Sequence, residues 1–73
     1  MERNELIEQA RMALAGRGVE YDTSTWLTRD DMDCTVVAFI SNGAESAVYK
    51  IDILSRGRFM CHRLAVVEAI PLA

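Results

Sequence analysis

The sequence predicts an α+β fold in which an N-terminal helix packs on an antiparallel meander of three to four strands, in the order α-(β)-β-β-β. Apolar residues near the N-terminus recur with a helical period, and two later runs are rich in β-branched and aromatic residues. Asn42-Gly43, a strong hairpin signal, separates these runs. The 73 residues are 51% hydrophobic and 26% charged, which is typical of one small globular domain spanning residues 1–73.

The helix is predicted from the spacing of its apolar residues. One helical face collects Leu6, Ile7, Ala10, Ala13 and Leu14. We expect Asn4 to cap the N-terminus, because an asparagine side chain accepts a hydrogen bond from the first turn. We expect Gly16 and Gly18 to end the helix, because glycine adopts the left-handed conformation at little cost.

Residues 19–33 have the weakest pattern in the chain. A short edge strand is predicted from the alternation of Val19, Glu20, Tyr21, Asp22 and Thr23. In the segment STWLTRDDMD that follows, Thr28 and Asp31 have capping-box spacing. This segment therefore forms a single helical turn or an irregular connection.

Two turns are predicted to organise the meander. Asn42-Gly43 favours a two-residue type I′ turn, in which position 41 pairs with 44 and Ala38 lies opposite Ala47. The sequence SRGR at 55–58 predicts the second turn, with 55 paired to 58.

Side chains alternate across a sheet, so this register divides them between two faces. In the same register Ile51 lies opposite His62. The face predicted to meet the helix carries Cys34, Val36, Ala38, Ile40, Ala47, Tyr49, Ile51, Ile53, Met60, Leu64 and Val66. The second face carries Val37, Phe39, Val48, Leu54, Phe59 and Ala65, mixed with Thr35, Lys50, Asp52, Cys61 and Arg63.

The second face predicts a partner, because one short helix cannot cover both sides of a sheet. Monomers rarely leave large apolar patches open. A second copy related by a twofold axis or a different protein would cover the patch. The predicted partner-binding residues are Trp26, Asp30, Asp31, Asp33, Val37, Phe39, Val48 and Phe59.

Two parts of this predicted surface have other interpretations. Trp26 either closes one end of the core or anchors an interface, where tryptophan is enriched. The acidic residues form a solvated loop, hold a hard cation, or dock on basic groups of another protein. The DxDxDG pattern of a calcium loop is missing.

A dimeric regulator associated with nucleic acid is the alternative function. The possible nucleic-acid contacts are Lys50, Arg56, Arg58 and Arg63. A formal net charge of −3 and the lack of an aromatic stacking ladder argue against nucleic acid as the sole partner.

An enzyme subunit is the third possibility, with Cys61, Asp52 and His62 as its only candidate residues. The predicted register places Cys34 and Cys61 on opposite faces, too far apart for a disulfide. No CxxC or HxxxH spacing indicates a metal site. We expect no catalytic residue, no metal and no cofactor.

The sequence predicts a non-enzymatic protein-binding module that acts stoichiometrically on a protein target. The length and acidic balance are typical of small inhibitors and regulators from phages and mobile elements, anti-CRISPR proteins among them. Charged residues begin at position 2, and the longest uncharged stretch, 34–44, is shorter than the about 20 residues of a membrane span. We expect a cytoplasmic protein without membrane contact.

Overall fold

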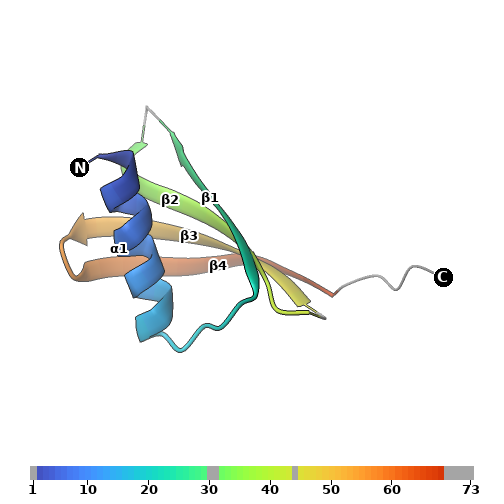
Figure 1. The fold of residues 1–73 in the computed structure, drawn as a ribbon. Coiled ribbons are helices and arrows are strands. Elements are labelled where there is room, and N and C mark those ends of the chain that lie inside the picture. The colour runs from blue at the N-terminus through green and yellow to red at the C-terminus, as the bar shows by residue number, and fades with distance from the viewer. Residues whose placement is uncertain (1, 30–31, 44, 69–73) are drawn as a thin grey trace.

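The computed structural model describes residues 2–29, 32–43 and 45–68, and it confirms the predicted fold class. One helix, α1 (Arg3–Gly16), precedes four strands. The strands are β1 (Thr23–Arg29), β2 (Met32–Ser41), β3 (Glu45–Ser55) and β4 (Arg58–Glu68). They form one antiparallel sheet in the order β1-β2-β3-β4, and α1 crosses one face of it (Figure 1).

The helix buries the predicted apolar stripe but begins differently from the prediction. Leu6, Ala10, Ala13 and Leu14 are buried against the sheet. The N-cap is Glu2, whose side chain makes no capping hydrogen bond, and its carbonyl accepts the Leu6 N–H at 2.9 Å. The prediction of Asn4 as the cap is wrong, because Asn4 already lies within the first turn.

The helix ends in a Schellman motif. The Gly18 N–H donates to the Ala15 carbonyl at 3.0 Å, and the Val19 N–H donates to the Leu14 carbonyl at 3.1 Å. Gly18 has a φ of +74°, which glycine adopts without a steric penalty. Val19 then packs against the core that contains Leu14, so the motif directs the chain back toward the sheet.

The predicted strand at Val19–Thr23 is wrong, and so is the predicted helical turn after it. Val19 and Tyr21 pack on the core from a connection without regular structure. Strand β1 begins at Thr23 and pairs with β2, with Trp26 opposite Ala38. The tertiary contact of Trp26 with the core therefore decides the local structure. Asp31 of the predicted capping box lies outside the described residues.

The β2–β3 hairpin is shifted by two residues from the predicted register. Ser41 pairs with Ser46, and the Asn42 N–H donates to the Glu45 carbonyl at 3.0 Å. Asn42 and Glu45 therefore flank the turn, and Gly43 within it has a φ of +88°. A two-residue shift preserves the alternation, so the side chains of β2 and β3 lie on the predicted faces.

Strand β4 differs from β2 and β3, because two bulges interrupt the register of its pairing with β3. Ser55 pairs with Arg58 as predicted, but Ile53 pairs with Phe59, which leaves Leu54 as an extra residue. A second shift lies between Val48 and Tyr49, and Leu64 is the extra residue there.

Between these bulges β4 is displaced by one residue from the predicted register, which reverses its faces. Phe59 and Cys61 pack against the helix-side core. Met60 and Leu64 are exposed, and Met60 lies opposite Asp52. The predicted placement of Met60, His62 and Leu64 on the core face is therefore wrong, as is that of Phe59, Cys61 and Arg63 on the second face.

Candidate functional site

The sheet has a second face that α1 does not cover (Figure 1), and we call it the open face. Its apolar members are Leu27, Val37, Phe39, Val48 and Met60. Its polar members are Thr25, Thr35, Lys50, Asp52 and His62. Among the described elements only α1 lies outside the sheet, and it covers the other face; most of these side chains are therefore at least partly exposed, although Thr35 is buried at 6% exposure.

Cross-strand pairing brings the apolar residues together. Leu27 pairs with Val37 in one row, and Phe39 pairs with Val48 in the next. Leu27 is 46% exposed and Phe39 43%, while Met60, 48% exposed, lies apart from them on β4, opposite Asp52. By contrast Val36, which precedes Val37 and faces the helix, is 0% exposed. Exposed apolar side chains grouped in this way are typical of a protein interaction surface.

The polar side chains beside this patch bind one another. The Thr35 hydroxyl donates to Asp52 Oδ1 at 2.6 Å, and Lys50 Nζ lies 3.9 Å from Asp52 Oδ2. The charges of Lys50 and Asp52 therefore offset each other locally. The open face combines an apolar centre with a neutral polar margin, as non-obligate protein interfaces do.

Trp26 is a core residue, which excludes the predicted role as an exposed anchor. It is 7% exposed, and its indole N–H donates to Ser24 Oγ at 2.9 Å. The Arg11 guanidinium carbon lies 4.8 Å from the centre of the ring, and the Tyr21 ring meets it edge to face at 6.0 Å. These contacts seal the β1 side of the core, as the other interpretation of the sequence predicts.

The remaining predicted partner-binding residues divide into three groups. Val37, Phe39 and Val48 lie on the open face. Phe59 lies on the helix side, because of the bulge at Leu54. Asp30 and Asp31 lie outside the described residues, and so does the side chain of Asp33.

Sequence reasoning missed two apolar members of the open face, Leu27 and Met60. Leu27 could have been found from its position next to Trp26, because neighbouring residues in a strand point to opposite faces. Met60 had no such signal, since only the bulge places it there.

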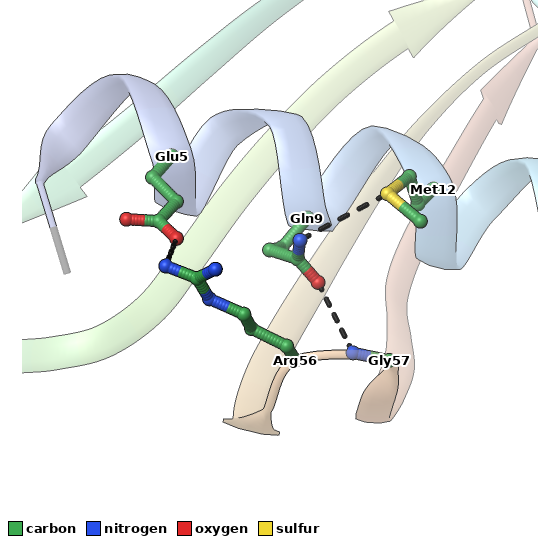
Figure 2. Close-up of polar contacts among 5 residues, drawn as sticks. All are labelled: Glu5, Gln9, Met12, Arg56 and Gly57. Carbon is green, nitrogen blue, oxygen red and sulfur yellow. Dashed lines mark hydrogen bonds and ion pairs between the residues drawn. The ribbon is translucent and has the colours of Figure 1, made fainter.

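The predicted basic patch is not assembled. Lys50 lies on the open face opposite His62, whereas Arg63 lies on the helix side opposite Tyr49. The Arg56 guanidinium pairs with the Glu5 carboxylate at the N-terminal end of α1, as Figure 2 shows. Arg58 and Arg63 are both exposed, and neither forms an ion pair with another described residue. The four cations therefore present no continuous surface to nucleic acid.

A second contact joins the β3–β4 turn to the helix. The Gln9 side-chain oxygen accepts the Gly57 N–H at 3.2 Å, and the Gln9 amide contacts Met12 Sδ at 3.9 Å (Figure 2). Together with the pair between Glu5 and Arg56, this contact holds the hairpin against α1.

The three candidate catalytic residues do not form a catalytic arrangement. Cys61 faces the helix side, while Asp52 and the exposed His62 lie on the open face. Burial raises the pKa of the Cys61 thiol, the Arg17 charge lowers it in part, and Asp52 raises it further. A thiol with a raised pKa is a poor nucleophile at neutral pH, because the thiolate is the reactive form.

The two cysteines are free thiols on strands that β3 separates. Cys34 is exposed, whereas Cys61 is half-buried and packs against the core. The sequence placed Cys34 in the core and predicted that its replacement by serine would be the more destabilising. The observed burial predicts the opposite order. Cys61→Ser should be the more destabilising substitution, because it would bury a polar hydroxyl at position 61.

Among the described residues, no three His, Cys, Asp or Glu side chains are grouped as a metal site would require. The same part of the chain has no helix long and apolar enough to cross a membrane. No family model, curated protein or solved structure matches this chain.

Proposed function

We propose that the chain is a non-enzymatic binding module that acts stoichiometrically by covering a protein surface with its open face. The observation that supports this function is the group of apolar side chains on the uncovered side of the sheet. Such a module would act in the cytoplasm as an inhibitor or regulator, the class that its size and composition suggest.

The physical reason is the free energy of removing these side chains from water. Burying apolar surface contributes about 25 cal/mol per Å², so covering several large side chains stabilises a complex appreciably. Phe39 is the largest apolar side chain of the group and lies between Thr25 and Val48 in its row. Large aromatic residues commonly contribute the most to the affinity of an interface.

A matched pair of substitutions tests the proposal. Phe39→Glu places a charge on the open face, while Met12→Glu places the same charge on α1, where Met12 is 53% exposed. Both positions are on the surface, so we expect both variants to fold. Circular dichroism and thermal melting establish this first.

The decisive measurements are sedimentation equilibrium of the purified chain and affinity capture from the native host followed by mass spectrometry. We expect the wild type and Met12→Glu to self-associate or to retain a defined protein at one-to-one stoichiometry. Phe39→Glu should lose this self-association or this protein. The proposal is wrong if the wild type stays monomeric at millimolar concentration and Phe39→Glu retains the same proteins as the wild type.

A further inference from the structure

The open face carries a cation and an anion side by side. Lys50 and Asp52 are two residues apart on β3, and Lys50 Nζ lies 3.9 Å from Asp52 Oδ2. Because side chains alternate along a strand, both residues point to the same face. Their charges offset each other there, so a second open face that approaches this one meets no net repulsion. The surface is therefore electrostatically compatible with its own copy.

The open face is also large enough for a specific interface. Along β2 and β3 its four rows are Ser41–Ser46, Phe39–Val48, Val37–Lys50 and Thr35–Asp52. Four strands about 4.8 Å apart and four rows about 6.8 Å apart make a face of about 500 Å². Two such faces packed together bury about 1,000 Å², which reaches the lower limit expected for a specific interface.

The core on the helix side is small for a chain of 73 residues. Four of the 11 residues in its buried cluster are alanines, namely Ala10, Ala13, Ala38 and Ala47. Domains of this size bury little apolar surface and commonly gain stability by association. A second copy is the one partner that is present whenever the chain is made.

We propose that a second copy of this chain covers the open face while no target protein is bound, and that a target must displace it. The inference rests on the proposed function, in which the open face is the contact surface. Two sheets packed face to face keep their strands nearly aligned. A twofold axis along the strands, between β2 and β3, meets this condition and keeps each row of one copy opposite the same row of the other.

This axis places each β2 residue over its β3 neighbour in the other copy. Phe39 lies over the second copy's Val48, and Val48 lies over its Phe39. In the next row Lys50 lies over Val37, and in the last row the carboxylate lies over a threonine, so no like charges are opposed. An axis across the strands through the Val37–Lys50 row would instead place the two Lys50 side chains on each other. Charge therefore favours the axis along the strands.

Opposite charges at position 39 test this geometry. The axis brings the two copies of position 39 to neighbouring strand positions, about 4.8 Å apart along the sheet. Phe39→Glu and Phe39→Lys should each weaken the dimer at least about tenfold, because each pairs like charges across the axis. An equimolar mixture of the two variants should associate at least about tenfold more tightly than either alone, because a carboxylate then lies beside an ammonium group. Sedimentation equilibrium of the full chain measures all three.

The matched controls are Met12→Glu and Met12→Lys, which place the same charges on α1, where Met12 is 53% exposed. Alone or mixed, they should leave the dissociation constant of the dimer unchanged. A measurement on the wild type needs no substitution. Dilution of the ¹⁵N-labelled chain from millimolar to micromolar concentration should shift the amide resonances of residues 37–39 and 48–50 and leave those of α1 in place.

Three outcomes overturn the inference: a wild type that is monomeric at millimolar concentration, a dimer that persists unweakened in both charged variants, or a mixture that associates no more tightly than either variant alone. Dilution shifts confined to residues outside the open face have the same meaning. The proposed function survives such a failure if the monomer retains a host protein that Phe39→Glu loses. Retention of the same proteins by Phe39→Glu contradicts the proposed function instead.

Discussion

The two faces of the sheet differ in what covers them, although the same strands supply both. On the helix side, Val36, Ala38 and Ile51 are 0% exposed, and α1 packs on them. On the open face, Leu27 and Phe39 keep nearly half of their surface. A face built for water would carry polar residues at these positions. The difference supports the proposal that hydrophobic side chains here serve two purposes, a core on one side and a contact surface on the other.

The largest expected effect on stability is the difference between a charge introduced on the helix side of β2 and the same charge introduced on the open face. Val36→Asp buries an unpaired carboxylate under the helix, which costs more than about 3 kcal/mol and should unfold so small a domain. Val37→Asp places the same group on the half-buried open face, where we expect a loss of about 1 kcal/mol. Urea denaturation followed by circular dichroism measures both. Equal losses would show that the open face is internal.

The second comparison uses neighbouring residues of β1. Trp26→Ala should lower the free energy of unfolding by about 3–5 kcal/mol, because it empties part of the core and removes the contacts with Arg11 and Tyr21. Leu27→Ala removes an exposed side chain and should cost less than about 1 kcal/mol. The same denaturation assay applies. A small loss of unfolding free energy for Trp26→Ala would contradict its burial in the core and favour the predicted role of an exposed anchor.

The third prediction concerns the thiol on the helix side. In a Cys34→Ser variant, Cys61 should react with iodoacetamide more slowly in the folded chain than in urea. The pH at which this reaction rate rises should also be higher in the folded chain. The raised pKa means that the fold prefers the protonated thiol. Its contribution to stability is therefore complete below the unfolded pKa of about 8.5 and is lost as the pH rises through the folded value. Identical pH profiles for folded and unfolded chains would contradict the burial of Cys61.

The smallest effect is expected at the hairpin tip. Arg56→Ala removes the pair with Glu5, and because the Arg56 side chain is 75% exposed, the loss should be below about 1 kcal/mol. A double-mutant cycle with Glu5→Gln isolates the coupling, which should fall as salt is added. A coupling that salt does not change would show that the contact with the helix is not electrostatic.

Local pattern was sufficient for the helix and for the faces of β2 and β3. The helical period of Leu6, Ala10 and Leu14 survives any tertiary arrangement, because one apolar stripe has only one surface to bury. The two-residue shift at Asn42-Gly43 left every side chain of β2 and β3 on its predicted face, since strand alternation has a period of two. The open face was therefore predictable at Val37, Phe39 and Val48.

Only the tertiary structure decided the rest. Nothing in the sequence around Leu54 or Leu64 predicts a bulge. The two bulges nevertheless place Met60 at the margin of the open face and bring Phe59 and Cys61 onto the helix side. In the same way, Trp26 forms part of a strand because burying its ring against Arg11, Tyr21 and the core outweighs a weak local preference. The physical reason is common to both cases. A one-residue difference in strand register changes the local backbone energy little. The burial of a large side chain, which depends on contacts far apart in sequence, therefore determines which register is stable.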